Sequence, residues 1–422
     1  MGAGQVDAKM VAMKMNIAIA GAGIGGLAAA SLLAQDGHRV RVYDQFAAPR
    51  PVGSGLVIQP VGLEVLGAAG AAAEVMKRGA PILRMFGDEV AKGRTILAVT
   101  YGEAADRQGL GIHRAALFQA LYDAAIAAGA QVMASSTVSG REGQCLLIGN
   151  RLEGPFDLIV DGLGAASCLS PLTARPLPYG AVWATVPWPG NAPFPQDQLT
   201  QRYRKADRML GILPVGTMGD APERRLAAIF YSLKREAIDA HFTRPFADWR
   251  DEATALWPEF AAFLPDTLSH DDFAAARYTH GALRRPYEDG LVHIGDAAHR
   301  ASPQLGQGAN MALLDARALQ LALRRARGHE ALRLYAGARR WHVALYQALS
   351  ASFTPQYQSD SVILPLLRDH VLARLSMTWP VSVILTKLVC GDLVPPMPAL
   401  TPLAARVAEK TAKVTGKTGR PG

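Results

Sequence analysis

The sequence predicts an α/β fold. It consists of a Rossmann-like domain, an inserted domain built mainly on an antiparallel sheet, and a helical tail at the C-terminus. Three observations lead to this prediction. A glycine-rich turn follows a short apolar run near the N-terminus, short alternating runs fill the middle of the chain, and a second glycine-rich turn opens a long helical stretch near residue 310. Apolar strands followed by helices are typical of parallel sheets, and alternating runs are typical of antiparallel ones.

The first unit of the predicted Rossmann-like domain spans residues 16–44. Residues 16–20 read as a buried strand, 27–35 as a helix and 39–43 as a second strand, after which comes Asp44. In the glycine-rich turn, Gly21 permits a tight turn, Gly23 lets the backbone approach a pyrophosphate, and Gly26 lets the helix pack closely on the strand. Helix N–H groups attract the anion, and an acid about 20 residues past the glycines can bind a ribose. This unit predicts a dinucleotide site that includes Gly21, Gly23, Ile24, Gly25, Gly26 and Asp44.

The next elements are read in the same way. Residues 54–60 are expected to form a loop with a short strand, 114–128 an alanine-rich helix, and 157–161 another buried strand. Prolines and aromatic residues then become frequent between residues 171 and 195. Alternating runs at 181–186, 199–203, 209–213 and 226–233 predict antiparallel strands, followed by a helix at 246–256 and a strand at 273–279.

The second glycine-rich cluster indicates which dinucleotide is bound. A strand at residues 291–294 ends at Asp296, whose carboxylate is placed to bond a ribityl hydroxyl, and Pro303 shapes a loop. The following turn opens a helix over 309–327, so its N–H groups and positive dipole end would stabilise an anionic reduced flavin. An ordinary turn with a helix N-cap is the alternative. Together the two clusters predict FAD, held in this region by Asp296, Pro303, Gly306, Gln307, Gly308, Ala309 and Asn310.

With these motifs, the sequence resembles the single-component FAD-dependent aromatic hydroxylases, the group A flavoprotein monooxygenases with the para-hydroxybenzoate hydroxylase-like fold. The resemblance covers residues 16–368 and includes Gly111-Ile112-His113-Arg114. It implies that Arg114 reaches FAD, although an ordinary helix-start arginine is the alternative. One motif differs from the family pattern. Leu163 replaces its internal acid, Ala166 occupies its arginine position, and an acid, Asp161, appears two residues before Leu163. Gly164 and Ser167 remain, so FAD binding is expected there, with Gly164 as a cofactor residue.

The resemblance also implies the domain layout. Residues 15–86, 87–175 and 280–350 are expected to form three parts of the FAD-binding domain, residues 176–279 the substrate domain, and residues 351–422 the C-terminal helical tail. The antiparallel sheet would cover the flavin. Its inward side chains would contact substrate or simply pack in the core: Trp183, Tyr203, Met209, Ile212 and Tyr231. His299 lies between two flavin-binding elements, and a structural role is favoured for it over a role at the flavin.

The activity that the resemblance implies is monooxygenation. NAD(P)H would reduce FAD, and a flavin hydroperoxide would transfer one oxygen atom from O₂ to an aromatic or electron-rich small molecule. No universal catalytic residue is expected. Leu163 and Ala166 motivate an alternative, a flavin oxidase or dehydrogenase on the same fold without oxygen insertion. A non-catalytic dinucleotide-binding scaffold is the third hypothesis.

Composition limits the partners. The chain has 422 residues, a net charge of +8 and no dense basic run with interleaved aromatics, so nucleic acid is not expected. Cys145, Cys168 and Cys390 are far apart, which predicts no disulfide framework, no metal site and a cytoplasmic location. No apolar stretch is long enough to span a bilayer. The segment 362–389 alternates apolar and basic residues. Packing on the substrate sheet is favoured for it, and membrane contact that admits a lipophilic substrate, such as a quinone precursor, is the alternative.

Overall fold

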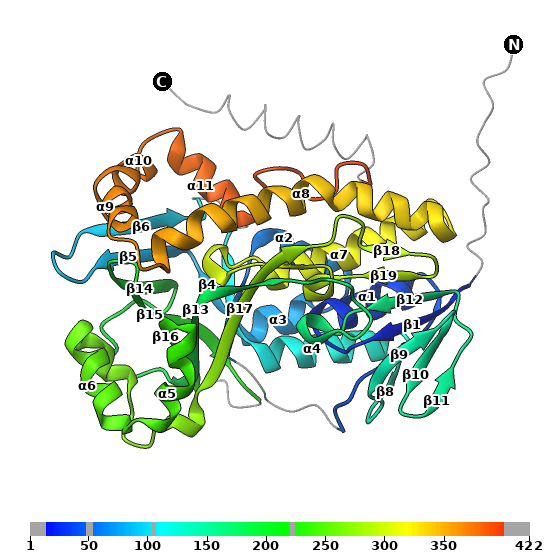
Figure 1. The fold of residues 1–422 in the computed structure, drawn as a ribbon, viewed down its shortest axis with the longest axis horizontal. Coiled ribbons are helices and arrows are strands. Elements are labelled where there is room, and N and C mark those ends of the chain that lie inside the picture. Colours follow the sequence, from blue (N-terminus) through cyan, green and yellow to red (C-terminus); the bar gives the residue numbers. More distant parts are fainter. Residues whose placement is uncertain (1–13, 48–53, 103–106, 220–223, 401–422) are drawn as a thin grey trace, which may run out of the picture.

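The computed structural model describes residues 14–47, 54–102, 107–219 and 224–400, and two large sheets organise them (Figure 1). The first sheet has the strand order β18-β19-β12-β1-β2-β8, and all neighbouring pairs except β18 with β19 are parallel. The bounds of its strands are β1 (Asn16–Ala20), β2 (Arg39–Tyr43), β8 (Gln131–Met133), β12 (Leu158–Asp161), β18 (Tyr287–Glu288) and β19 (Leu291–His293). The Rossmann-like prediction is confirmed.

Helices cover this sheet with small apolar side chains. The large core around it is rich in alanine, leucine and valine, which allows α1 and α7 to lie close together. The bounds of the helices in this half are α1 (Ile24–Gln35), α2 (Pro60–Ala68), α3 (Ala72–Arg78), α4 (Arg114–Ala127) and α7 (Gly308–Leu323). The helices predicted at 27–35, 114–128 and 309–327 are therefore present, with ends shifted by a few residues.

Two small sheets complete this half of the molecule. One joins β3, β7 and β4, and the other is a meander of β9, β10 and β11. Their bounds are β3 (Gly55–Ile58), β4 (Ala80–Ile82), β7 (Gly109–His113), β9 (Val138–Glu142), β10 (Cys145–Ile148) and β11 (Arg151–Glu153). The short strand expected within residues 54–60 is β3, whereas the meander was not predicted.

The second large sheet has eight strands in the order β20-β17-β13-β16-β15-β14-β5-β6, and only the β14–β5 pair is parallel. The strand bounds are β5 (Arg84–Glu89), β6 (Thr95–Thr100), β13 (Arg175–Pro187), β14 (Gln198–Arg204), β15 (Arg208–Thr217), β16 (Arg225–Lys234), β17 (Ala274–Ala282) and β20 (His299–Arg300). All five predicted strands of the inserted domain form, and the fold class is confirmed.

The domain boundary predicted at residue 87 is wrong. It cuts β5 in two, and the structure places both β5 and β6 at the edge of the eight-stranded sheet instead of in the FAD-binding half. The physical reason is distance along the chain. Strand β5 pairs with β14, more than 100 residues later, and nothing local marks such a partner.

Short helices cover one face of the eight-stranded sheet. Trp249, Trp257, Phe260 and Phe263 bury their rings against strand residues such as Val182 and Ile212. The helical segments there are η2 (Arg235–Ala237), α5 (Ile238–Thr243), α6 (Phe246–Leu256), η3 (Pro258–Phe263) and η4 (His270–Asp272). The helix predicted at 246–256 is α6. The opposite face of the sheet looks toward the FAD-binding half and the tail.

A long helix, α8 (Gly328–Tyr357), runs along the top of Figure 1 and leads into the tail. The predicted boundary at residue 350 therefore falls inside a continuous helix. The tail continues as α9 (Ile363–Leu367), η7 (Arg368–Leu372), α10 (Ala373–Ser376) and α11 (Val381–Cys390). Both α10 and α11 contact β6 at the edge of the large sheet, as expected for a tail that packs on that sheet.

Candidate functional site: an FAD cradle joined to an apolar cavity

The glycine-rich turn after β1 is held by contacts that only glycine permits. Gly21 has φ +99°, and a Cβ built on it would lie 2.5 Å from the Gly162 carbonyl oxygen. A Cβ on Gly26 would lie 2.0 Å from the Gly21 carbonyl oxygen. These two glycines bring α1 tightly onto the ends of β1 and β12, as the sequence predicted for Gly26.

Three other glycines, one from each of the three motifs, face open space. A Cβ on Gly23 would meet only the Gly162 oxygen, at 3.8 Å, and a Cβ on Gly164 or Gly308 would meet no atom within 4 Å. Gly23 caps the N-terminus of α1, and Gly308 begins α7. Two helix N-termini, with their free N–H groups, therefore border the same space, which suits a ligand with two anionic or electron-rich regions.

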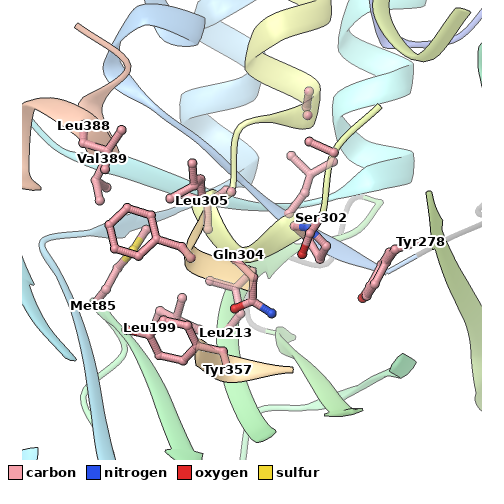
Figure 2. A pocket seen from close by; sticks show the side chains of 18 of the residues that line it. Met85, Leu199, Leu213, Tyr278, Ser302, Gln304, Leu305, Tyr357, Leu388 and Val389 are labelled. Carbon is pink, nitrogen blue, oxygen red and sulfur yellow. The ribbon is translucent and has the colours of Figure 1, made fainter. Parts of the chain in front are cut away.

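That space is a cavity of about 680 Å³, which extends from the two glycine turns to the large sheet. Figure 2 shows the part of the cavity between the large sheet and the loop before α7, where Met85, Leu199, Leu213 and Tyr357 border the space and Gln304 and Leu305 project from that loop. Most of the predicted cofactor residues line this cavity: Gly23, Ile24, Gly25, Gly26, Arg114, Gly164, Asp296, Pro303, Gly306, Gly308 and Ala309.

Asp44 does not line the cavity but braces the glycine turn. Its carboxylate accepts hydrogen bonds from the backbone N–H of Ala22, at 2.6 Å, and of Phe46, at 3.1 Å. The second strand thereby holds the turn that Gly21 begins. A bond from Asp44 to a ribose stays a prediction.

Gln307 and Asn310 were predicted to hold cofactor, but their side chains clamp the protein. The Asn310 amide accepts from Gln59 N, at 2.8 Å, and donates to the Gly306 carbonyl, at 3.0 Å. Gln307 Nε2 donates to the Val389 carbonyl in α11, at 2.7 Å. Neither residue is among those that line the cavity, and their side chains fix the loop and the tail. Contact of their backbone N–H groups with FAD stays a prediction.

The motif that differs from the family pattern contributes to a buried acid–imidazole pair. Asp161 is fully buried at the end of β12, and its Oδ2 lies 2.7 Å from His293 Nδ1 at the end of β19. The same carboxylate accepts from Ser167 Oγ, at 2.7 Å, and from Leu163 N, at 3.1 Å. It therefore holds the turn η1 (Gly164–Ala166), whose first residue lines the cavity. Asp161 and His293 are in register on neighbouring strands, a relation that only the sheet order reveals.

A second buried cluster lies beneath the loop η5 (Gly295–Ala297), which carries Asp296. Asp315 in α7 accepts from His299 Nε2 at 2.6 Å, from Gly295 N at 2.9 Å and from Arg339 Nε at 2.8 Å. Burial opposes ionisation of Asp315, but His299 and Arg339 outweigh it and lower the pKa to about 2. His299 is thus a structural residue, as favoured from the sequence. The sequence prediction missed Asp315 and Arg339.

Arg339 extends this cluster to the tail. It donates to the Pro396 carbonyl, at 3.0 Å, and lies beside His342, whose Nε2 is 3.0 Å from the Gly391 carbonyl oxygen. Burial, aided by Arg339, lowers the pKa of His342 to about 3, so this imidazole is neutral near pH 7. One buried network therefore links the cofactor loop, α8 and the segment after α11.

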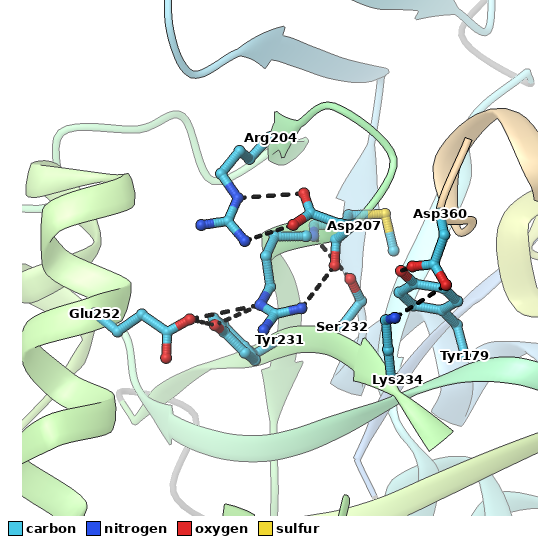
Figure 3. A network of polar contacts seen from close by, with 10 residues as sticks. Tyr179, Arg204, Asp207, Tyr231, Ser232, Lys234, Glu252 and Asp360 are labelled. Atoms are coloured by element: carbon cyan, nitrogen blue, oxygen red, sulfur yellow. Dashed lines mark hydrogen bonds and ion pairs between the residues drawn. The ribbon is translucent and has the colours of Figure 1, made fainter. Parts of the chain in front are cut away.

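Three of the five predicted substrate-facing residues line the cavity. Trp183, Tyr203 and Met209 lie on the open face of the sheet, whereas Ile212 and Tyr231 are on the opposite face. Figure 3 shows Tyr231 pointing to Glu252 of α6, to which its hydroxyl donates. Side chains alternate along a strand, so Met209 and Ile212 cannot share a face of β15. Leu213 and Phe230 occupy the positions that the prediction gave to Ile212 and Tyr231.

Few polar side chains reach the substrate end. The Tyr203 hydroxyl donates to Gln201 Oε1, at 2.8 Å, and Trp183 Nε1 donates to the Tyr278 hydroxyl, at 3.3 Å. Burial raises the pKa of Tyr203 well above its usual range and that of Tyr278 to about 12. Both phenols stay protonated near pH 7 and serve as hydrogen-bonding groups. Among the described lining residues, Asp296 is the single carboxylic acid, and none is histidine.

The cofactor end contains unsatisfied polar atoms. Ser302 Oγ, Gln304 Nε2 and Gln59 Nε2 are buried without a hydrogen-bond partner. Ser302 and Gln304 line the cavity, and Gln59 Nε2 lies 3.4 Å from the Cβ position of Gly306. Buried polar groups are normally paired, so these atoms are available to a polar ligand. Together with the open glycine positions, they fit the carbonyl and nitrogen atoms of FAD.

Comparisons with known proteins agree with this geometry. The family model described as "FAD binding domain" matches residues 14–144 and 202–344. The FAD-dependent urate hydroxylase of Klebsiella pneumoniae subsp. pneumoniae is 26% identical over 74% of this chain and 82% of its own. The 2-heptyl-3-hydroxy-4(1H)-quinolone synthase of Mycobacteroides abscessus is 27% identical over 81% of this chain and 88% of its own.

The fold also matches a solved structure. A crystal structure of 2-methyl-3-hydroxypyridine-5-carboxylic acid oxygenase superimposes with a TM-score of 0.73 and 19% identity, over 89% of this chain and 97% of that one. The relative named as a hydroxylase gives no support to the oxidase or scaffold alternatives.

Proposed function

This chain belongs to the FAD binding domain family and is an FAD-dependent monooxygenase, and from that premise we propose that it hydroxylates a lipophilic aromatic small molecule with O₂ and NAD(P)H. Bound FAD would accept a hydride from the reductant and deliver one oxygen atom from O₂ to the substrate. The observation that carries the proposal is the continuity of the cavity, which joins the FAD cradle directly to the apolar face of the large sheet.

The chain's own contribution at the cofactor end is electrostatic. The N-terminus of α1 would bind the pyrophosphate, and the N-terminus of α7 would stabilise negative charge on the reduced ring. Arg114 lines the cavity and is exposed, with no ion-pair partner among the described residues, so its guanidinium is available to the cofactor. Asp296 would accept a hydrogen bond from a ribityl hydroxyl.

At the substrate end, the chain positions an apolar molecule and excludes water. The lining residues there are largely aliphatic or aromatic: Met85, Ile96, Leu97, Val99, Leu199, Leu213, Phe230, Leu372, Leu375 and Leu385. Excluding water protects a reactive oxygen donor from side reactions. The neutral phenol of Tyr203 and the amide of Gln201 supply the few directional contacts that fix one orientation of the substrate.

These linings favour an aromatic ring that bears an apolar substituent. Three charged side chains are among the described lining residues: Arg114 and Asp296 at the cofactor end, and Arg368 at the substrate end. The Arg368 guanidinium already donates to Asp369, Gln356 and Lys205, and it lies 5.3 Å from the ring centre of Tyr203. It therefore shapes the cavity wall. The quinolone synthase among the relatives makes, by its name, a heptyl-bearing hydroxyquinolone.

The first experiment is the visible absorption spectrum of the purified protein during anaerobic addition of NADH and then NADPH. We expect flavin bands that bleach with at least one of the two, although Leu163 and Ala166 replace the acid and the arginine of the family pattern. Bands that resist both reductants, with and without aromatic compounds, would contradict the NAD(P)H part of the proposal. A colourless protein that takes up no FAD would contradict the whole of it.

The second experiment tests oxygen insertion. Alkyl-substituted phenols, quinolones and pyridines are screened for stimulation of NAD(P)H oxidation, and the best compound is incubated under ¹⁸O₂. One ¹⁸O atom in the product is expected. Substrate oxidation that yields hydrogen peroxide and an unlabelled product would instead support the oxidase alternative.

A further inference from the structure

The tail presents an unusual apolar face to solvent. Sixteen large apolar side chains are exposed in the described part of the chain, and ten of them lie between residues 362 and 384. We call these ten the tail face: Val362, Ile363, Leu366, Leu367, Val371, Leu375, Met377, Trp379, Val383 and Ile384. Single exposed apolar side chains are ordinary on soluble proteins, whereas a concentration of them in one segment marks a binding surface.

The helices of the tail are apolar on both sides. Leu372, Ser376 and Leu385 line the cavity, Val371 and Ile384 are exposed to solvent, and Leu375 is exposed and also borders the cavity. A surface helix of a soluble protein normally turns polar residues outward. Among the described residues, no single helix meets the length and apolarity needed to cross a membrane, but 363–376 and 381–390 meet that test together, with a bend of 97° between them. A bent apolar pair of this kind suits the plane of a bilayer surface better than a crossing.

The charges of the tail that have no ion-pair partner among the described residues are cationic. Its carboxylates are engaged by basic groups: Asp360 with Lys234, Asp369 with Arg368, and Asp392 with Arg107. Figure 3 shows the first pair, with Tyr179 donating to the same carboxylate. By contrast, Arg374 and Lys387 are exposed and form no ion pair within the described residues. Both lie on helices that carry the tail face, so an anionic partner is favoured.

We propose that the tail face docks this enzyme on an anionic lipid bilayer. Ile363, Leu366 and Val371 would enter the boundary between headgroups and acyl chains, and Trp379 would lie at the interface, where tryptophan is favoured. Arg374 and Lys387 would contact anionic headgroups, and removal of either charge would weaken binding to the bilayer. The inference does not depend on the proposed hydroxylation.

Docking in this orientation has a consequence for access. The helices that carry the tail face also form one wall of the cavity, through Leu372, Leu385 and Leu388. In Figure 2, Leu388 and Val389 of α11 border the cavity close to Leu305 of the cofactor loop. A lipophilic molecule in the bilayer would therefore lie within one helix layer of the reaction site.

The test is co-sedimentation of the full-length holoprotein with vesicles of phosphatidylcholine alone or mixed with phosphatidylglycerol. Wild type is expected to bind the anionic vesicles more tightly. Ile363→Glu and Trp379→Glu should each weaken partitioning about tenfold or more, because a buried apolar contact is replaced by a charge. Arg374→Gln with Lys387→Gln should reduce the preference for anionic vesicles and leave weak binding to neutral ones.

Trp341 offers a matched control. It is 70% exposed on α8, outside the tail face, whereas Trp379 is 82% exposed within it. Trp341→Glu should bind vesicles like wild type. In a Trp341→Phe background, Trp379 is the one exposed tryptophan of the five that remain, so the long-wavelength part of the emission should shift to the blue on vesicle addition and become protected from acrylamide. An unchanged spectrum, or equal binding by wild type and Trp379→Glu, overturns the proposal.

Two further measurements distinguish membrane docking from dimerisation through the tail face, and an intact variant from a misfolded one. If wild type is a dimer that Trp379→Glu dissociates, and neither binds vesicles, the tail face pairs two copies and the membrane proposal is wrong. The flavin absorbance of each variant must match wild type, which shows that the fold and cradle are intact. A yellow, active enzyme that ignores vesicles would refute this inference alone and leave the proposed hydroxylation standing.

Discussion

The two ends of the cavity are formed by different parts of the chain, mainly backbone at one end and side chains at the other. The cofactor end consists mainly of backbone: glycine turns, two helix N-termini and a loop held from beneath by Asp315, with a few polar side chains such as Asp296 and Ser302. The substrate end consists of side chains from strands far apart in sequence, such as Met85, Leu199 and Leu213. The first depends on local sequence, and the second depends on how a sheet is assembled. Substitutions that act on one end and spare the other test whether this division is real.

The largest effect is expected at the cofactor end from Gly26→Ala. The added Cβ would lie 2.0 Å from the Gly21 carbonyl oxygen, and backbone atoms cannot yield as a flexible side chain would. We expect loss of soluble, FAD-containing protein, measured by flavin absorbance after purification. Gly67→Ala is the control, because its Cβ would meet no atom within 4 Å on the exposed side of α2, and alanine there should stabilise by about 0.5–1 kcal/mol. A yellow Gly26→Ala protein with the melting temperature of wild type would refute the backbone argument.

Asp315→Asn is expected to cost about 3–5 kcal/mol of unfolding free energy, because it leaves the buried Arg339 without its carboxylate partner. Urea denaturation at pH 7 measures it. The exposed pair Arg250–Asp266 provides a control, since Asp266→Asn should change stability by less than about 1 kcal/mol. Equal effects of the two substitutions would show that the Asp315 cluster does not hold the cofactor loop.

The same aspartate gives a pH dependence. Its pKa is about 2 in the folded protein, below the value of about 3.9 in an unfolded chain. Its contribution, about 2–3 kcal/mol, is therefore present above pH 4 and is lost as pH falls toward 2. Asp315→Asn should flatten the acid limb of the stability curve between these values. An acid limb identical to that of wild type would mean that the Asp315 carboxylate is not stabilised by folding.

What could be predicted from the sequence follows the same division. Gly21, Gly26 and Asp296 lie in short motifs whose geometry is local, so their places in the fold were recognisable. Ile212 and Tyr231 were assigned to the wrong face because the register of a strand depends on distant partners. Strands β5 and β6 and the Asp161–His293 pair were missed for the same reason. Gln307 and Asn310 lie in a local motif, yet their side chains bond to distant segments.

The two faces of β15 can be separated by a pair of substitutions. Leu213→Trp places an indole in the cavity and should raise the KM for the best aromatic substrate about tenfold or abolish turnover, with flavin content unchanged. Ile212→Val, on the opposite face, should cost about 1 kcal/mol of stability and leave KM as it is. Steady-state kinetics and thermal melts of both variants provide the comparison. A large change in KM for Ile212→Val would show that the substrate contacts the face of the sheet opposite the cavity, which would contradict the site described here.

The smallest effect is expected for Arg114, the one cationic side chain at the cofactor end of the described cavity lining. Because the guanidinium is exposed, its attraction to FAD is screened, and Arg114→Gln should weaken FAD binding by less than about 1 kcal/mol, or up to about fivefold. Fluorescence titration of the apoprotein with FAD measures the Kd, and raising the ionic strength should narrow the difference from wild type. Arg39→Gln, at an exposed position at the start of β2, should leave the Kd unchanged. A loss far above tenfold for Arg114→Gln would show that this end of the cavity also relies on a side chain, and the contrast between a backbone-built cradle and a side-chain-built pocket would then have to be redrawn.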